Sequence, residues 1–205
     1  KSESGVPVRV TPDTLFLCPR SDFAEWPEGR RSTRICIATE QVMGPVRNGG
    51  IGVLERIQVG LPVKPTFPLV APGPVPQDLD FEMWLGPAPQ RAYTPGITDA
   101  QVWRQIRDFS GGSLTDWGAH LVDTAQVANF TENSGPVTVA GQGIIPSRAI
   151  NTVPQTYRLT YTYANGVVLE VSTGDTFIRF EGSKGWVGNK GWAGPLEASD
   201  MALFR

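Results

Sequence analysis

The C-terminal third of the chain constrains the fold most, because short apolar segments alternate there with strong turn signals. Residues 155–164 and 167–173 flank Asn165-Gly166, a dipeptide typical of a two-residue β-hairpin turn. The other segments of this kind are the expected strands at 137–145 and 176–181 and the turn at 182–185. Strands joined by tight turns pair antiparallel, so the sequence predicts a mostly antiparallel sheet.

The middle of the chain carries the expected helices, a short one over residues 99–109 and a longer one over 114–130. Before them, a turn at Asn48-Gly49-Gly50 precedes a predicted strand over 53–60, and the proline-rich residues 61–80 indicate an extended connector. Because helices are expected only in this middle part, we predict an α+β fold. Its open sheet has helices on one face and leaves the other face free to meet a partner.

The first 45 residues show no clear period. Two short apolar pieces, at 14–18 and 35–38, could be buried strands. We therefore divide the chain into an N-terminal arm of unclear structure, residues 1–45, and a domain over 46–205.

Composition excludes several classes of function. The 18 lysines and arginines and 20 aspartates and glutamates give a net charge of −2 without a basic cluster, which argues against nucleic-acid and membrane partners. No apolar run reaches the ~20 residues of a membrane span, and no secretory signal is recognisable, so we expect a cytoplasmic protein. Cys18 and Cys36 are too few for a disulfide scaffold or a zinc site; they could pair, but two free thiols are the commoner case.

The densest chemistry lies around His120, the only histidine of the chain. If its segment is helical, Asp116, His120 and Asp123 lie at i, i+4 and i+7 and share one face. Gly111-Gly112-Ser113 would let backbone or substrate approach closely at the helix start.

Three interpretations of this face remain open. His120 could be a hydrogen-bonded, half-buried ring with Asp116 at the helix start. It could instead move a proton to or from a hydroxyl, oriented by a carboxylate. Asp116, His120 and Asp123 could also hold a divalent metal, although most such sites use two or more histidines.

Aromatic side chains are numerous in the segments expected to be loops. Flat rings suit the C–H faces of sugars, and filling the edge of the core is an equally good interpretation. The aromatic residues in question are Trp84, Tyr93, Trp103, Trp117, Trp186 and Trp192. Arg104 and Arg107 beside Asp108 could clamp an anionic substrate, but an ordinary surface ion pair is favoured.

No phosphate-binding P-loop is present, and no Gly-x-Gly-x-x-Gly follows a strand and opens a helix. The sequence nevertheless resembles the bacterial-type C-terminal domain of Gfo/Idh/MocA oxidoreductases over about residues 46–195. The resemblance is carried, in order, by 46–54, Val59-Gly60-Leu61-Pro62, Trp84-Leu85-Gly86-Pro87-Ala88-Pro89, Asp108-Phe109-Ser110-Gly111-Gly112, Asp116-x-Gly118-x-His120-x-x-Asp123 and Phe180-Glu181-Gly182-Ser183-Lys184-Gly185-Trp186.

The resemblance implies an open-sheet domain that supplies a sugar pocket. It gives Asp116 and His120 the catalytic roles. Substrate contacts are expected from Asp123, Arg104, Tyr93, Trp84, Trp103 and Lys184. In such enzymes a Rossmann domain binds NAD or NADP, but residues 1–45 are too few for one, and the family's Glu-Lys-Pro lysine is absent.

We therefore expect no nicotinamide cofactor in this chain and a small carbohydrate as its ligand. The first hypothesis is hydrolysis or elimination at a glycoside by acid/base chemistry of His120 and Asp116. The alternative is the substrate-binding or dimerisation domain of an NAD(P)-dependent sugar or cyclitol dehydrogenase, inactive alone. Because both faces of the predicted hairpin carry apolar residues, and because related enzymes pair in this way, we also expect at least a homodimer through the sheet.

Overall fold

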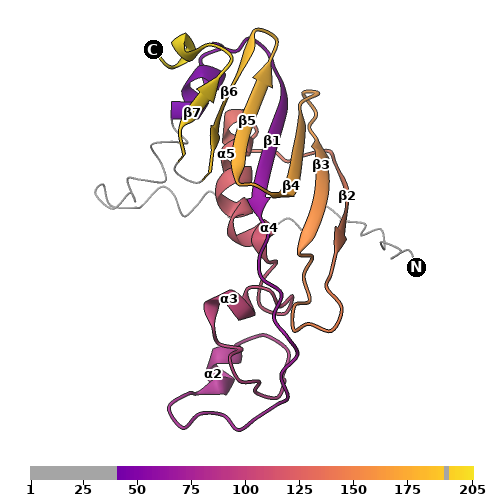
Figure 1. Cartoon of the computed structure of the whole chain (residues 1–205). Helices are drawn as coiled ribbons and strands as arrows, with labels where there is room; N and C mark the ends of the chain where they lie inside the picture. Colours follow the sequence, from indigo (N-terminus) through magenta and orange to yellow (C-terminus); the bar gives the residue numbers. More distant parts are fainter. Residues whose placement is uncertain (1–40, 192–193) are drawn as a thin grey trace, which may run out of the picture.

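The computed structural model describes residues 41–191 and 194–205. Figure 1 shows a body built on one sheet and a smaller lobe at the end of that body. The sequence-based expectations that lie outside the described residues are those for Cys18, Cys36, Trp192 and the strands at 14–18 and 35–38.

Seven strands form the sheet, in the order β2-β3-β4-β1-β5-β6-β7. Only β1 and β4 pair parallel; the other neighbours pair antiparallel, which confirms the predicted mostly antiparallel sheet. The strands are β1 (Leu54–Pro62), β2 (Thr138–Ile144), β3 (Thr156–Thr162), β4 (Val168–Gly174), β5 (Phe177–Gly182), β6 (Gly185–Lys190) and β7 (Leu196–Ala198).

The two tight turns lie where local sequence placed them. Between β3 and β4, Gly166 has a φ of 86°, and the side chain of Asn165 accepts a hydrogen bond from the Val167 N–H at 3.2 Å. A left-handed φ there costs glycine nothing, which explains the strength of this signal. Ser183 and Lys184 form the turn between β5 and β6.

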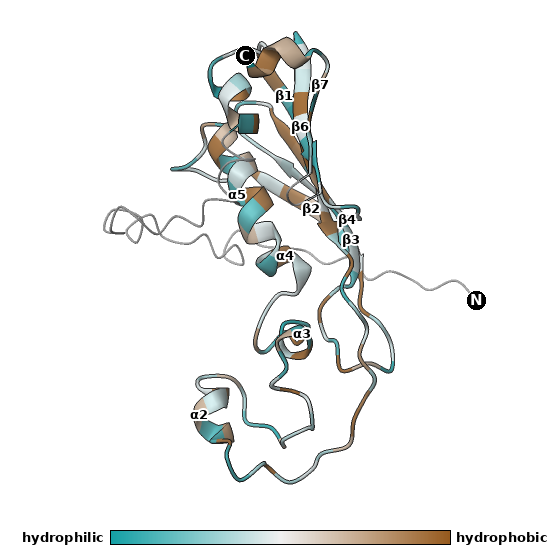
Figure 2. Cartoon of the chain, turned by 60° about the vertical axis from the view of Figure 1, so that its left-hand side comes forward, coloured by the Kyte–Doolittle hydropathy of each residue, from teal (hydrophilic) through white to brown (hydrophobic). Residues whose placement is uncertain are grey.

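A single long helix covers one face of the sheet. Helix α5 (Gly118–Ala128) buries Leu121, Ala125 and Ala128, and Figure 2 shows it beside the sheet seen nearly edge-on. The sheet contributes buried side chains to this main core, which are Ile57, Val59, Leu61, Tyr157, Tyr161, Tyr163, Leu169, Val171, Ile178, Phe180 and Val187.

The main core also takes in residues before the expected domain start. Residues 41–47 are helical, and Val42 and Val46 are buried within the core. The core therefore includes residues on both sides of position 46. None of the helices within the described ranges has the length and hydropathy of a membrane span.

The opposite face of the sheet carries charged side chains. Arg56 in β1 lies 2.5 Å from a carboxylate oxygen of Glu170 and 3.6 Å from one of Glu181. Arg179 lies 2.8 Å from Glu181, and its guanidinium is 3.9 Å from the centre of the Trp186 ring. Strands that pair in register place these side chains on one face, so they form a continuous polar network.

This polar face differs from the expectation that both faces of the hairpin are apolar. Along β3, the buried Tyr157 and Tyr161 alternate with the exposed Arg158 and Thr160. The period of a strand is two residues, so the tyrosines all turn toward α5. Dimerisation through this face stays a prediction, which light scattering at micromolar concentration would test.

The lobe has a small core of its own. It contains α2 (Phe81–Leu85) and α3 (Ala100–Trp103), so the helix expected over 99–109 is only four residues long. The buried residues of this second core are Phe81, Leu85, Ile97, Ile106 and Ile150. Asp80 and Asp99 cap the two helices, each accepting a backbone N–H of the first turn.

The loop between β2 and β3 joins the lobe to the sheet. It supplies Ile150 to the second core. Next to it, Asn151 accepts the Phe67 N–H at 2.8 Å and donates to the Pro65 carbonyl at 3.0 Å. A segment 84 residues away along the chain is thereby fixed against the proline-rich connector.

The phenol of Tyr161 gives a test of this packing. Burial raises the pKa of Tyr161 from 10.0 to about 12, so the folded state disfavours its ionised form. Stability linked to Tyr161 is present below pH 10 and is lost as the pH rises toward 12, by about 2 to 3 kcal/mol. Urea unfolding at pH 8 to 12 should show a shallower decline for Tyr161→Phe than for the wild-type chain. Equal slopes for the two proteins would contradict this.

Candidate active site

Helix α4 (Ser113–Asp116) begins directly after a glycine that the structure requires. Gly112 has a φ of 67°, and a Cβ at this position would lie 2.7 Å from a methyl carbon of Val153. The next residue, Ser113, is 3% exposed and donates its hydroxyl to the Pro62 carbonyl at 2.8 Å. This hydrogen bond fixes the start of α4 to the end of the central strand β1.

The single helix expected over 114–130 is two helices, α4 and α5, that meet at Trp117. The N–H groups of His120 and Leu121 both donate to the Trp117 carbonyl, at 3.1 and 3.2 Å. The bond from His120 spans three residues instead of four, so the backbone is wound more tightly at this point. Asp116 lies at the end of α4, before this point, and His120 and Asp123 lie on α5 after it.

Asp116 lies between two cations. Its carboxylate oxygens are 3.5 Å from Lys64 Nζ and 3.7 Å from Arg104 Nε. Both distances are longer than a charge-assisted hydrogen bond, and the Asp116 side chain is 28% exposed. Lys64 Nζ also lies 5.0 Å from the centre of the Trp117 ring, and the Lys64 side chain is 12% exposed.

Lys64 is a residue that the sequence analysis missed. It lies 52 positions before Asp116 in the proline-rich connector, and only the contact of α4 with the end of β1 brings the two together. One signal could have found it, because Lys64 is the only charged residue between Arg56 and Asp78.

His120 and Asp123 lie on the exposed side of α5. Partial desolvation raises the pKa of Asp123, and the charge of His120 opposes that shift. The two side chains therefore interact electrostatically. Within the described residues no three side chains of His, Cys, Asp or Glu are grouped to hold a metal ion, so Asp116, His120 and Asp123 do not form the metal site considered from sequence.

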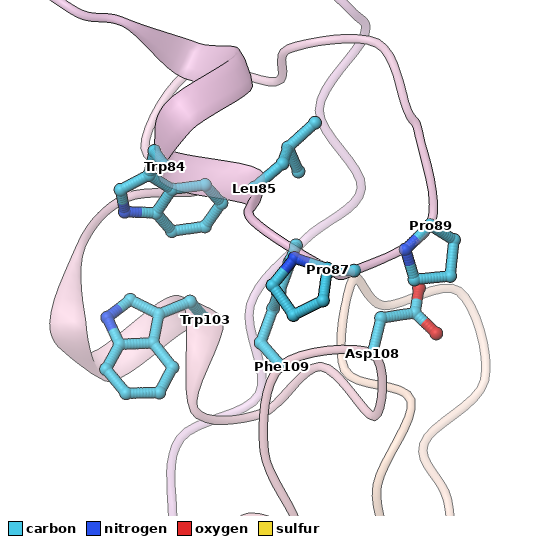
Figure 3. Close-up of a pocket in the computed structure, with 8 residues that line it drawn as sticks. Trp84, Leu85, Pro87, Pro89, Trp103, Asp108 and Phe109 are labelled. Atoms are coloured by element: carbon cyan, nitrogen blue, oxygen red, sulfur yellow. The ribbon is translucent and has the colours of Figure 1, made fainter.

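Two of the expected aromatic residues line a hollow of about 420 Å³ in the lobe. Figure 3 shows the indoles of Trp84 and Trp103 on one side of this hollow, with Pro89 and Asp108 on the other. Leu85 and Phe109 complete much of its lining.

The remaining aromatic residues have other surroundings. Tyr93 makes an edge-to-face contact with Phe81, 5.2 Å between ring centres, and belongs to the second core. Trp117 packs against the main core, and Trp186 lies on the polar face of the sheet.

The arginines near α3 do not form the clamp considered with Asp108. Arg104 points to Asp116, while Asp108 has its nearest cation in Arg91, at 3.9 Å. The Arg107 N–H donates to the Thr152 hydroxyl at 2.7 Å.

Lys184 is not brought to this cluster. The Lys184 N–H donates to the Ile51 carbonyl at 2.9 Å, just before the start of β1. The nine residues of β1 span about 26 Å, and α4 is fixed at the other end of this strand. A contact of Lys184 with the ligand of Asp116 therefore has no support in this arrangement.

The arrangement has a definite chemical capacity. A carboxylate flanked by two cations lies four residues before an exposed imidazole that belongs to the next helix. Such groups can accept hydrogen bonds from hydroxyls, donate to ligand oxygens and move a proton.

Comparison with known proteins agrees with this architecture. The family model described as oxidoreductase family, C-terminal alpha/beta domain (GFO_IDH_MocA_C2), matches residues 68–191. No curated protein sequence matches the chain.

Solved structures resemble the chain at low identity. The WlbA dehydrogenase from Chromobacterium violaceum, in complex with NADH and UDP-GlcNAcA, has a TM-score of 0.52 at 17% identity, covering 82% of this chain and 43% of that one. WlbA from Bordetella pertussis, in complex with the same ligands, has a TM-score of 0.50 at 16% identity, covering 80% of this chain and 44% of that one. An NAD-binding protein from Listeria innocua has a TM-score of 0.51 at 15% identity, covering 80% of this chain and 38% of that one. The likeness is one of fold, and the chain spans less than half of each of these proteins.

Gly112→Ala tests the junction that positions α4. The new methyl group combines a left-handed backbone with a close approach to Val153, so we expect a loss of about 1 to 3 kcal/mol in the free energy of unfolding. Gly135→Ala is the matched control, because a Cβ at that position has no atom within 4 Å. Denaturant unfolding measures both. A Gly112→Ala protein as stable as Gly135→Ala would show that a side chain is tolerated at position 112 and that glycine is not required there.

Proposed function

Because the chain belongs to the Gfo/Idh/MocA oxidoreductase family, we propose that it is the substrate-binding domain of a sugar or cyclitol dehydrogenase. The observation that carries this proposal is the placement of Asp116 between Lys64 and Arg104, at the end of the helix that precedes the one with His120. The family match supports this function better than glycoside hydrolysis or elimination, the first hypothesis from sequence.

His120 takes the proton of the substrate hydroxyl that is oxidised and returns it in the reverse direction. Asp116 accepts a hydrogen bond from a neighbouring hydroxyl and orients the ring. Lys64 and Arg104 hold the carboxylate in place and offer donors to oxygens of the sugar. A substrate with a negatively charged substituent suits this pair of cations, and the WlbA neighbours are in complex with UDP-GlcNAcA.

The nicotinamide cofactor is not assigned to these residues. A dinucleotide needs a strand, a glycine-rich turn and a helix that receives the pyrophosphate. In the described residues, β1 leads instead into the extended proline-rich connector. The described residues do not fit a dinucleotide, so a different domain or chain would have to hold the hydride acceptor.

Calorimetric titration tests the proposed substrate site. The probes are UDP-GlcNAcA, D-glucuronate, D-glucose and myo-inositol. We expect Asp116→Asn and His120→Ala to weaken binding of the best probe about tenfold each, because each removes one polar partner of the sugar. Asp78→Asn, an exposed change elsewhere, should bind like the wild-type chain.

Circular dichroism establishes that each variant is folded. Folded variants of Asp116 and His120 that bind every probe as well as the wild-type chain would contradict the proposed site. The same titration with NAD and NADP should give no binding, and micromolar binding would contradict the assignment of the cofactor to another domain or chain.

A further inference from the structure

We propose that the hollow between α2 and α3 is a stacking subsite for a second, uncharged sugar unit. It rests on the proposed function and extends it, because the substrate would then be a glycoside of at least two units. The reacting unit lies at Asp116 and His120, and the neighbouring unit lies against Trp103.

The position of Trp103 is the first reason. Its side chain is half-buried, yet it belongs to neither the main core nor the second core. Trp84, on the same side of the hollow, is different, since it stacks on Phe81 at 5.6 Å and meets Phe109 edge-on at 4.9 Å. Core packing therefore accounts for Trp84 and leaves the ring of Trp103 as a surface of the hollow.

Continuity with the charged cluster is the second reason. The guanidinium carbon of Arg104 lies 5.0 Å from the centre of the Trp103 ring. The Nε of the same side chain lies 3.7 Å from Asp116. Arg104 thus contacts both Trp103, which lines the hollow, and Asp116, so one side chain connects the hollow to the Asp116 cluster.

The chemistry of the lining is the third reason. Indole, proline and leucine side chains give flat apolar walls, as Figure 3 shows, which suit the C–H faces of a pyranose ring. Asp108 supplies the acceptor for hydroxyls at the rim. It lies 3.9 Å from Arg91, beyond hydrogen-bond distance, and its side chain is partly exposed, so hydroxyl donors can reach it. The volume of about 420 Å³ falls within the range of small-molecule sites, about 300–1,000 Å³.

The carboxylate of Asp108 also decides whether a charged or a neutral sugar unit fits the hollow. Among the residues that line the hollow only Asp108 is charged, and it is 45% exposed with its partner Arg91 outside the lining, so a carboxylate or phosphate in the hollow would face a like charge. The two cations beside Asp116 instead attract a carboxylate or phosphate group. We therefore assign the neutral unit of the glycoside to the hollow and any charged unit to the Asp116 cluster.

The experiment compares disaccharides with their monosaccharides on the full chain. The probes are cellobiose with glucose, lactose with galactose, and chitobiose with N-acetylglucosamine. At least one disaccharide should bind about tenfold more tightly than its monosaccharide and should shift the indole N–H resonance of Trp103 in ¹⁵N NMR spectra. The Trp103→Phe spectrum identifies that resonance.

Variants separate this proposal from the proposed function. Trp103→Ala should remove the tenfold advantage and leave the monosaccharide affinity within about twofold, while Trp103→Phe keeps most of the advantage. Trp186→Ala, on the polar face of the sheet, is the matched control and should change neither.

Each outcome decides one of the two proposals. If monosaccharides bind in an Asp116-dependent manner but no disaccharide gains from Trp103, the subsite is overturned and the proposed function stands. If disaccharide binding needs Trp103 but neither Asp116 nor His120, the hollow binds sugar and the proposed function fails. Absence of any sugar-induced shift at Trp103 overturns the subsite.

Discussion

The hydrogen bond from the Ser113 hydroxyl to the Pro62 carbonyl is the contact on which the site depends. It joins the first residue of α4 to the last residue of the central strand. Position 112, just before it, has a left-handed backbone and no space for a Cβ, so only glycine fits there. Because Lys64 follows Pro62 by two residues, this one junction also brings Lys64 to Asp116. The carboxylate, its cations and the following imidazole are therefore positioned by the end of the central strand.

The lobe is attached to the sheet by polar contacts at several points. Asn151 holds the connector, Thr152 donates its N–H to the Gln105 carbonyl, and Gln105 itself is 1% exposed. Buried polar groups are costly unless paired, so the hydrogen bonds of Asn151 and of the Gln105 carbonyl favour one arrangement of the two parts. That arrangement sets Arg104, at the end of α3, against Asp116, at the end of α4.

The two faces of the sheet differ in the side chains that they carry. The face toward α5 buries apolar side chains and tyrosines, and it supplies the hydrophobic stabilisation. The opposite face carries a network of arginines and glutamates that stays partly solvated. Exposed ion pairs contribute little to stability, so this network adds little to the free energy of folding.

Local sequence determined the parts of this protein that depend on neighbouring residues. The hairpin at Asn165-Gly166, the turn before β6 and the antiparallel character of the sheet follow from turn chemistry and period-two alternation. The expectation that Asp116 and His120 act together also came from helical spacing, which is local, and it stays a prediction. Tertiary structure alone decided the rest. It placed β1 between β4 and β5, divided the helix at Trp117, brought Lys64 across 52 positions to Asp116, and left Trp103 outside both cores. Those outcomes depend on contacts between distant segments, and a pattern that repeats over a few residues carries no information about them.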